Sequence, residues 1–309
     1  MTRVDLITGF LGAGKTTFIH RYLEHLTDRR VLVIENEFGS VGVDARLLRD
    51  EDCDIEDLSG VCMCCRGRGQ FIGMLMDAAT RGIDRVLVEP SGIYDVDEFF
   101  GVMDEVRGLC EIGSVVAIVD ARVPEALSPE SEALMFSQLM AAGAVVLSKV
   151  QGEDEGAAAR TVAWLNGLIL KCGGRRVLDD EVWAVDWEAL TDGDFERLMA
   201  CGYRRDEHPH HGANHEELYD TFMTADRCAD EADLSARLDA VMREPRFGRV
   251  LRVKGYIRDL EGNWYEVNCT PEDRAMHPVD DVRKGVLVVI GQGLSEEALK
   301  SAFISKTGR

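Results

Sequence analysis

The 309-residue sequence contains no run of 18 apolar residues, so we expect no membrane-spanning helix. It also lacks an apolar signal segment before its first predicted strand, which predicts a cytoplasmic protein. Basic residues are few: 35 Lys and Arg stand against 56 Asp and Glu, for a formal net charge of −21. Such a charge repels phosphate backbones and anionic lipid, so neither nucleic acid nor membrane is an expected partner.

The sequence shows no internal repeat, and 309 residues are enough for two domains with separate cores. Its nine cysteines are an odd number, which in a cytosolic chain argues against a disulfide framework. We therefore expect reduced thiols, some of which could be metal ligands.

Short apolar runs alternate with amphipathic segments through the first two thirds of the chain. The runs typical of strands are Val4–Thr8, Val31–Glu35, Arg85–Glu89, Val115–Val119, Ala144–Ser148 and Trp183–Val185. The segments typical of helices are Lys15–Leu26, Gln70–Arg81, Val96–Arg107, Glu132–Ala142 and Arg160–Leu170. Apolar strands separated by helices indicate an α/β fold with a mainly parallel sheet covered on both faces.

A polar stretch at Tyr203–Glu217 predicts a linker or a long surface loop. A second, smaller α/β unit is expected after it, with these elements: helix Asp230–Arg243, a hairpin of Val250–Arg258 and Asn263–Asn268 turning at Glu261-Gly262, strand Val286–Gly291 and helix Ser295–Ile304. We therefore divide the chain into a domain at 1–200, a linker at 201–217 and a domain at 218–309.

The strongest motif follows the first predicted strand. Residues 9–16 read Gly-Phe-Leu-Gly-Ala-Gly-Lys-Thr, a full match to G-x-x-x-x-G-K-[ST]. Glycines in such a loop turn backbone N–H groups toward phosphate oxygens, and the following helix points its positive end at the same anion. This pattern predicts binding of a nucleoside triphosphate, with Lys15 reaching the β- and γ-phosphates and the Thr16 hydroxyl on Mg²⁺. The residues assigned to the phosphate cradle are Gly9, Leu11, Gly12, Ala13, Gly14, Lys15, Thr16 and Thr17.

A second motif is Val86-Leu87-Val88-Glu89-Pro90-Ser91-Gly92, an apolar strand that ends in an acid and a tight turn. In a sheet with a phosphate-binding loop, a neighbouring strand delivers such an acid toward Mg²⁺ or the attacking water. We expect Glu89 to fill that role, and the N–H of Gly92 to contact the γ-phosphate. Lys15, Glu89 and Gly92 are the predicted catalytic residues.

Three thiols lie within four residues at Cys62-Met63-Cys64-Cys65. Thiolates this close repel one another unless a cation sits among them, so the cluster predicts a metal site. Thiolate-rich ligation suits Zn²⁺ or Cu(I) and, less well, Co²⁺ or Ni²⁺. Buried small apolar residues and a redox thiol cluster are the alternatives.

Four histidines crowd the polar stretch between the two predicted domains: His208, His210, His211 and His215. Imidazoles at this density could hold a secondary, labile metal. A solvated loop is an equal alternative.

Taken together, these motifs resemble the CobW-type GTPases, the YjiA-like proteins related to the UreG and HypB metallochaperones. The resemblance is carried by T-G-F-L-G-A-G-K-T-T at Thr8–Thr17, E-N-E-F-G at Glu35–Gly39, C-M-C-C at Cys62–Cys65, E-P-S-G at Glu89–Gly92, L-R-V-K-G-Y at Leu251–Tyr256 and V-V-I-G at Val288–Gly291. It implies slow, Mg²⁺-dependent GTP hydrolysis coupled to holding or delivering a transition metal, Zn²⁺ or Co²⁺. It also implies a client metalloprotein, and a homodimer is possible.

Residue by residue, the resemblance places Glu37 and Asp44 in the first switch region. It places the metal on Cys62, Cys64 and Cys65, with Glu37 as a further candidate ligand. The sequence departs from the family pattern at Val61, where relatives carry glycine, and at Ser40, where many carry an acid.

The guanine-recognition motif also departs from the family. Ser148-Lys149-Val150-Gln151 stands where relatives carry [NT]-K-x-D. The aspartate accepts two hydrogen bonds from guanine, whereas Gln151 offers one acceptor and one donor and suits adenine at least as well. Ser148, Lys149 and Gln151 therefore remain the expected base-binding residues for GTP or ATP, and we expect weaker guanine selectivity than in relatives with the intact motif.

The expected mechanism is a switch in which the bound triphosphate gathers the thiolates around the metal and hydrolysis releases it. No internal arginine finger is evident in the sequence, which predicts slow turnover. Two alternatives remain: a nucleotide-regulated metal buffer or sensor without a client, and a small-molecule kinase, in whose chemistry the cysteines have no place.

Overall fold

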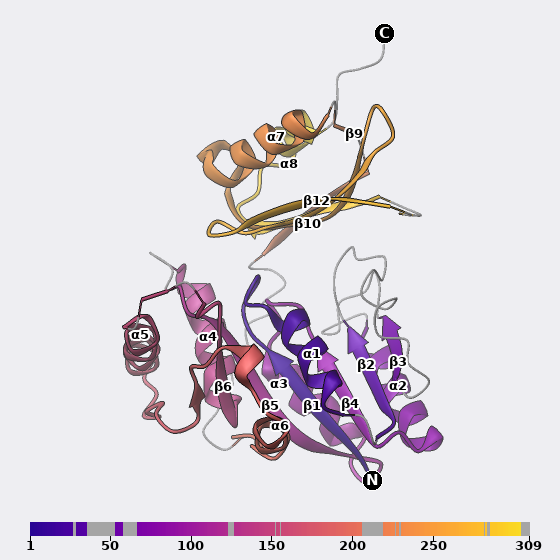
Figure 1. The fold of residues 1–309 in the computed structure, drawn as a ribbon, viewed down its shortest axis with the longest axis vertical. Coiled ribbons are helices and arrows are strands. Elements are labelled where there is room, and N and C mark those ends of the chain that lie inside the picture. The colour runs from indigo at the N-terminus through magenta and orange to yellow at the C-terminus, as the bar shows by residue number, and fades with distance from the viewer. Residues whose placement is uncertain are drawn as a thin grey trace. The chain divides into compact units, whose positions relative to one another are not determined.

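The computed structural model describes residues 1–26, 29–35, 53–57, 67–122, 127–151, 153–154, 156–205, 219–225, 227–228, 230–280, 282 and 285–303, with the backbone alone for 53–57. These residues form two compact units, one up to residue 205 and one from residue 219 (Figure 1). No helix among them is both long and apolar enough to cross a bilayer.

The first unit alternates strands and helices along the chain. Its elements are β1 (Thr2–Thr8), α1 (Lys15–Glu24), β2 (Val31–Glu35), β3 (Cys53–Asp57), α2 (Arg68–Arg81), β4 (Arg85–Glu89), α3 (Val96–Glu105), β5 (Cys110–Asp120), α4 (Pro129–Ala141), β6 (Ala144–Ser148), α5 (Ala157–Lys171), β7 (Val182–Trp183), the 3-10 helix η2 (Trp187–Ala189) and α6 (Asp192–Met199).

All strand pairs of this unit are parallel, in the order β3-β2-β4-β1-β5-β6-β7. The predicted mainly parallel sheet is therefore confirmed. The order places β1 between β4 and β5, so the loop after β1 meets the ends of both neighbours. Ligands of open parallel sheets bind at these carboxyl ends.

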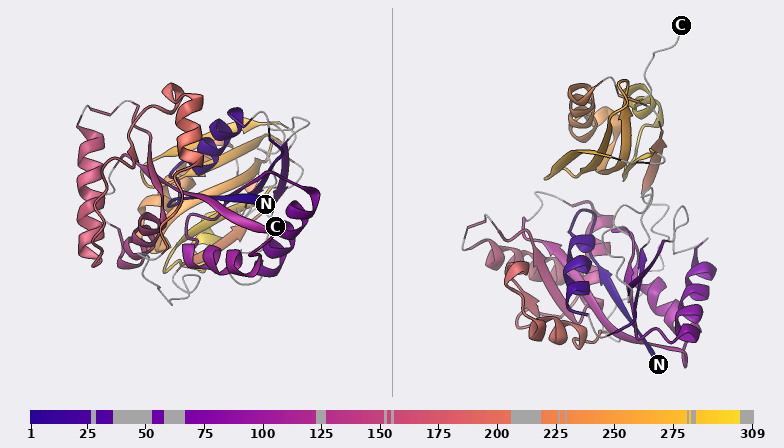
Figure 2. Two further views of the ribbon diagram at one scale, coloured as in Figure 1. Left: turned by 90° about the horizontal axis from the view of Figure 1, so that it is seen from below. Right: turned by 45° about the vertical axis from the view of Figure 1, so that its right-hand side comes forward.

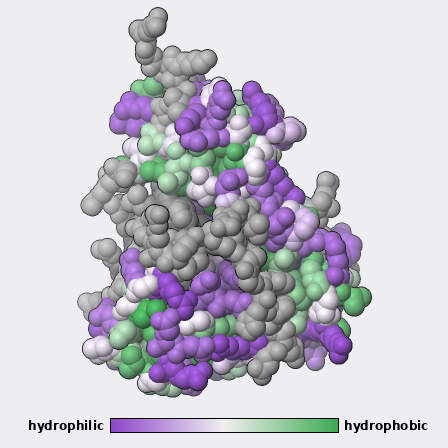
Figure 3. Space-filling model, turned by 180° about the vertical axis from the view of Figure 1, so that it is seen from behind, coloured by the Kyte–Doolittle hydropathy of each residue, from purple (hydrophilic) through white to green (hydrophobic). Residues whose placement is uncertain are grey.

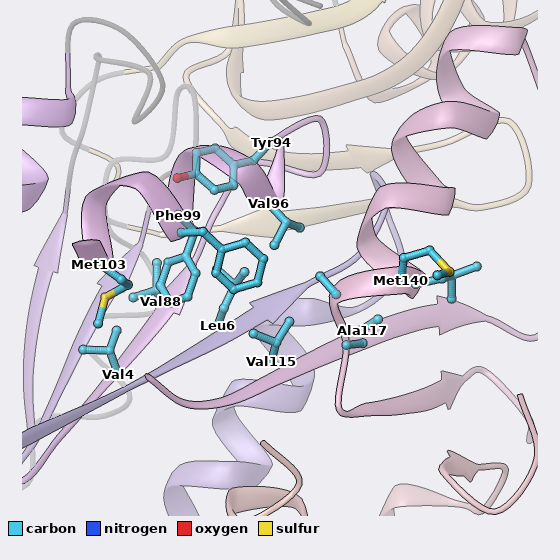
Figure 4. Packing of buried hydrophobic residues seen from close by; sticks show 14 of the residues in the cluster. Val4, Leu6, Val88, Tyr94, Val96, Phe99, Met103, Val115, Ala117 and Met140 are labelled. Carbon is cyan, nitrogen blue, oxygen red and sulfur yellow. The ribbon is translucent and has the colours of Figure 1, made fainter. Parts of the chain in front are cut away.

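Alternate strand residues divide the core of the first unit into two layers. Helices cover both faces of its sheet (Figure 2). Val86 and Val88 of β4 belong to the layer that includes residues of α2 to α5, whereas Leu87 belongs to the layer of α1 and α6. Figure 4 shows Phe99 of α3 over the strands in the first layer. Strands buried on both faces explain the continuous apolar runs in the sequence.

The second unit pairs a sheet with two helices. Its elements are β8 (Asp220–Thr224), β9 (Arg227–Cys228), α7 (Glu231–Arg243), the 3-10 helix η4 (Pro245–Phe247), β10 (Arg249–Asp259), β11 (Trp264–Cys269), β12 (Arg274–Val279), β13 (Leu287–Gln292) and α8 (Glu296–Phe303). The order is β12-β11-β10-β13-β8, antiparallel throughout, and β9 pairs with β10 in parallel. A smaller α/β domain is thus confirmed, and its sheet is mainly antiparallel.

The predicted hairpin joins β10 to β11 at Glu261-Gly262. Asp259 holds the turn: its Oδ1 accepts hydrogen bonds from the N–H groups of Gly262 at 2.7 Å and Asn263 at 2.8 Å. Gly262 has φ 103°, a left-handed conformation that favours glycine. The core beneath this sheet includes Leu234 of α7 and Leu299 of α8.

Several elements differ from the sequence expectations. The structure adds the strands β3, β8, β9 and β12, and the helix α6, which lies within a stretch that the sequence leaves unassigned. β7 covers Val182–Trp183, so it begins one residue earlier and ends two residues earlier than the expected Trp183–Val185. Outside the core, hydrophilic residues cover much of the visible described surface (Figure 3), in keeping with the excess of acids.

Candidate nucleotide-binding site

The loop between β1 and α1 uses glycine for steric reasons. Gly9, Gly12 and Gly14 have φ of 146°, 75° and 96°, values that residues with a Cβ rarely adopt. A Cβ on Gly9 would also lie 2.3 Å from the carbonyl oxygen of Ile118 in β5. The loop therefore adopts its tight course only with these glycines, as the motif predicts.

Lys15 opens α1, and its side chain is buried. Its Nζ donates hydrogen bonds to the carbonyl oxygens of Gly9 at 3.0 Å and Phe10 at 3.3 Å. The ammonium group thus turns back over its own loop. A phosphate held by the loop would meet that positive charge together with the helix N-terminus.

Thr16 of α1 and Glu89 of β4 are in contact, an arrangement that two ligands of one magnesium ion would need. The Thr16 hydroxyl donates a hydrogen bond of 2.8 Å to Oε1 of Glu89, and the Glu89 side chain is 6% exposed. This contact follows from the topology, because β4 lies beside β1 and both end at the same edge. Hydroxyl and carboxylate oxygens are ligands suited to Mg²⁺.

Glu35 is a further candidate site residue, with no role assigned to it from the sequence. It pairs in register with Glu89 across β2 and β4, and it is 8% exposed. Two buried carboxylates therefore end the neighbouring strands β2 and β4. The available signal was the position of Glu35 itself, which ends an apolar strand just as Glu89 does.

Gly92 lies on the backbone of the loop. A Cβ at this position would be 2.5 Å from the nitrogen of Leu11 and 2.8 Å from the carbonyl carbon of Phe10. The turn after β4 can approach the loop this closely only with glycine. The expected nearness of Gly92 to the phosphate cradle is thus present in the structure.

Lys149 bridges the loop and the end of β5. Its Nζ lies 2.9 Å from Oδ2 of Asp120 and donates to the carbonyl oxygen of Gly12 at 2.9 Å. Burial raises the pKa of Asp120, but hydrogen bonds from Arg122 and Lys149 outweigh it, so the net pKa is lowered and the carboxylate stays charged. Lys149 also has φ 56°, a left-handed backbone for a residue with a side chain.

Gln151 and Asp186 meet at the same end of the sheet. Gln151 follows β6 by three residues, Asp186 follows β7 by three residues, and β6 and β7 are parallel neighbours. Nε2 of Gln151 donates a short hydrogen bond to Oδ1 of Asp186. The same Oδ1 accepts a hydrogen bond from the N–H of Glu188 at 3.0 Å. Asp186 is a second residue that no sequence motif marks.

Trp187 joins this pair to the phosphate loop. A Cβ on Gly14 would lie 3.3 Å from its indole ring, and the side chain of Ser148 lies 3.6 Å from the same point. The indole N–H donates to the carbonyl oxygen of Leu147 at 2.9 Å, which fixes the ring. Ser148 and Lys149 therefore lie beside the loop that is expected to bind phosphate, and Gln151 contacts Asp186, the residue before Trp187.

Several predicted site residues lie outside the described part of the chain. They are Glu37, Asp44, Cys62, Cys64, Cys65, His208, His210, His211 and His215. Within the described ranges, no group of three His, Cys, Asp or Glu side chains could hold a metal ion.

A glycine loop between a strand and a helix, a lysine at its end and a facing acid define the first unit as a P-loop nucleotide-binding fold. The family model for the CobW/HypB/UreG nucleotide-binding domain matches residues 3–167, and that for the cobalamin synthesis protein cobW C-terminal domain matches residues 220–305. The chain belongs to the CobW/HypB/UreG family.

Curated relatives match over part of their length. The zinc chaperone CobW of Pseudomonas aeruginosa is 31% identical over 199 residues, covering 53% of each chain. The zinc chaperone YjiA of Escherichia coli is 35% identical over 127 residues, covering 38% of this chain and 40% of its own. The chain thus spans about half the length of the curated relatives that it matches. The crystal structure of the Zn(II)-bound YjiA GTPase from E. coli aligns over 97% of each chain, with 21% identity and a TM-score of 0.40.

Proposed function

We propose that the protein is a magnesium-dependent GTPase that binds Zn²⁺ or Co²⁺ through Cys62, Cys64 and Cys65 and delivers it to a metalloprotein. The observation that carries the nucleotide part is the 2.8 Å contact between Thr16 and Glu89, beside the charge of Lys15. A hydroxyl, a carboxylate and an ammonium group at one loop match the needs of a magnesium triphosphate.

In this proposal each residue has a separate task. Lys15 and the N–H groups of the loop bind the β- and γ-phosphates, and Thr16 and Glu89 hold the magnesium ion, which neutralises charge on the phosphate oxygens when bound. Glu89 also orients the attacking water. The N–H of Gly92 donates to the γ-phosphate, which its approach to the loop backbone allows.

Slow turnover is part of the proposal, because the nearest basic residue after the cysteine cluster in the described chain is engaged elsewhere. Arg68 donates hydrogen bonds to Glu105 at 2.6 Å and to Glu98 at 3.2 Å, which tie α2 to α3. In these contacts the Arg68 charge is paired with carboxylates of α3, and among the described residues none of its ion pairs reaches the phosphate loop.

The metal part rests on the cysteine cluster and the family. Cys62, Cys64 and Cys65 lie in sequence between Glu37 and Glu89, the proposed switch residue and the proposed magnesium ligand. Two matched relatives are described as zinc chaperones, which supports a transition metal as cargo. Order imposed by the triphosphate on segments flanking the cluster would couple metal affinity to nucleotide state.

The nucleotide part is tested by hydrolysis of GTP by the full chain with and without Mg²⁺. Lys15→Ala and Glu89→Gln should each lower kcat at least tenfold, because each removes charge at the reacting phosphate. Arg3→Met serves as a control, since Arg3 pairs with Glu111 near the opposite end of the sheet. Magnesium-independent turnover, or full activity of both site variants, would contradict the proposal.

The coupling is tested by zinc titration of the wild type and of a Cys64→Ser, Cys65→Ser variant, with and without a non-hydrolysable GTP analogue. We expect the analogue to tighten zinc binding in the wild type and the variant to lose the site. Zinc affinity that ignores the nucleotide would favour the metal buffer over the chaperone. Transfer of phosphate to a metabolite instead of water would favour the kinase.

A further inference from the structure

We infer that Asp186, held beside Gln151, supplies the carboxylate that selects guanine in the nucleotide site, an inference that rests on the proposed nucleotide binding. Position 151 is where the family motif carries its aspartate, and here it holds an amide. The structure brings a carboxylate to that amide from 35 residues further along the chain.

The contact fixes which end of the Gln151 amide is free. A charged carboxylate only accepts hydrogen bonds, so the group of Gln151 that faces Asp186 must be the NH₂. Oδ1 of Asp186 is occupied by this NH₂ and by the N–H of Glu188. The carbonyl oxygen of Gln151 and Oδ2 of Asp186 are then the two acceptors that the pair can offer to a base.

Two neighbouring acceptors discriminate between purines. Guanine presents two donors on this edge, N1–H and the 2-amino group, and both can be satisfied. Adenine presents an acceptor at N1 beside its 6-amino donor, so one acceptor of the protein would face another acceptor. An amide alone would offer adenine one acceptor and one donor. Here Asp186 engages one of the two N–H bonds of the Gln151 NH₂ group and adds its own Oδ2 as a second acceptor.

The pair lies where a base should lie relative to the phosphate loop. Trp187, the residue after Asp186, packs beside Gly14, and Lys149, two residues before Gln151, bonds to Gly12. Both connections are held at the carboxyl ends of β6 and β7. A nucleotide whose phosphates occupy the loop would therefore extend its base toward these two side chains.

The test measures binding of GTP, ATP and XTP to the full chain in competition with a fluorescent guanine nucleotide. Asp186→Asn keeps an acceptor for the N–H of Glu188 and so preserves the local turn. It replaces one acceptor near the base with a donor, which suits the 2-oxygen of xanthine instead of the 2-amino group of guanine. We expect the XTP-to-GTP affinity ratio to rise at least tenfold.

Glu188→Gln is the matched control. It removes the same charge two residues away, and its exposed carboxylate pairs with Arg21 at 3.2 Å rather than with the base pocket. We expect it to shift the ratio less than twofold.

The outcomes separate this inference from the proposed function. A wild-type chain that binds none of the three triphosphates would contradict the proposed function itself. Tight nucleotide binding with ATP preferred, with an unchanged ratio in Asp186→Asn, or with an equal shift in Glu188→Gln would instead overturn the role of Asp186.

Discussion

Gly92 packs so closely against the backbone nitrogen of Leu11 that a Cβ would lie only 2.5 Å away from it. This distance is shorter than any relaxed contact, and both partners are backbone, which cannot rotate away as a side chain can. The turn after β4 and the phosphate loop can therefore keep their present positions only if residue 92 has no Cβ.

Gly92→Ala should therefore displace the loop or the turn. We expect GTP turnover to fall at least tenfold, because the phosphate donors and Glu89 no longer share one geometry. The control is Gly73→Ala in α2, where a Cβ meets nothing within 4 Å. That change should leave turnover intact and stabilise the helix by up to about 1 kcal/mol. Steady-state kinetics measures the turnover of both variants, and thermal unfolding measures their stability. Wild-type turnover in Gly92→Ala would refute this prediction.

Thr16→Val should weaken the magnesium dependence of nucleotide binding. Valine keeps the volume of threonine but loses the hydroxyl that lies 2.8 Å from Glu89. We expect the tightening of nucleotide binding by Mg²⁺ to drop at least tenfold, with binding in EDTA nearly unchanged. Thr16→Ser retains the hydroxyl and should behave like the wild type. Isothermal titration with and without Mg²⁺ measures both, and an equal response to Mg²⁺ in the valine and serine variants would argue against Thr16 as a ligand.

The ion pair of Asp5 and Arg85 is the most deeply buried one among the described residues, with side chains 0% and 2% exposed. Arg85→Met would leave the Asp5 carboxylate buried without its counter-charge, although Ser114 still donates to it at 2.9 Å. We expect a loss of about 3–5 kcal/mol in the free energy of unfolding. Urea denaturation of the full chain measures this loss.

Arg3→Met is the control for that change, because Arg3 is the register partner of Arg85 and forms an exposed pair with Glu111. It should cost at most about 1 kcal/mol. Equal effects of the two substitutions would show that burial does not set the strength of the inner pair.

Three thiols outside the cysteine cluster should react slowly with alkylating reagents. Burial raises the pKa of Cys201 to about 12, with a further contribution from Asp5, and raises those of Cys228 and Cys269 to about 11. At pH 8 their thiolate fractions are therefore small, and alkylation should be at least about a hundredfold slower than for a free cysteine. The rate should rise about tenfold for each pH unit between 7 and 9, because deprotonation is still far from complete.

Peptide mass spectrometry after timed treatment with iodoacetamide measures these rates, with the unfolded chain as the reference. Rapid labelling of Cys201 at pH 8 would contradict the shift. As a companion test, Cys201→Ser should leave the zinc stoichiometry unchanged, which makes it the matched control for the cluster variants.

Sequence reasoning worked best where one signal sets the local structure. The loop at Gly9 to Gly14 was predicted because its glycines, the strand before it and Lys15 agree, and steric limits leave such a segment one conformation. The contact of Thr16 with Glu89 was also foreseeable, since parallel strands bring their carboxyl ends to one edge.

The edge strands were not predicted from the sequence, because they lack the apolar run of a buried strand. β3 reads C-D-I-E-D and pairs with β2 alone, and β12 carries Pro278 and pairs with β11 alone. Proline is tolerated at an edge because one side of the strand makes no sheet hydrogen bonds. α6 could have been found, since Thr191 and Asp194 form a capping box at its start.

The pairing of Gln151 with Asp186 could not be predicted from spacing. The two residues are 35 positions apart, and only the adjacency of β6 and β7 brings them together. A motif search scores position 151 by itself, whereas the chemistry belongs to two side chains on separate loops. Substitution of a motif residue therefore says little until its neighbours in space are known.

The left-handed backbone of Lys149 has a consequence for protein engineering. A residue with a Cβ at φ 56° carries about 1 kcal/mol of local strain that glycine would not. Lys149→Gly would relieve this strain, yet it would also delete the cation that links Gly12 to Asp120. The relief of strain and the loss of this ion pair oppose each other, so a search for heat resistance should gain little at position 149.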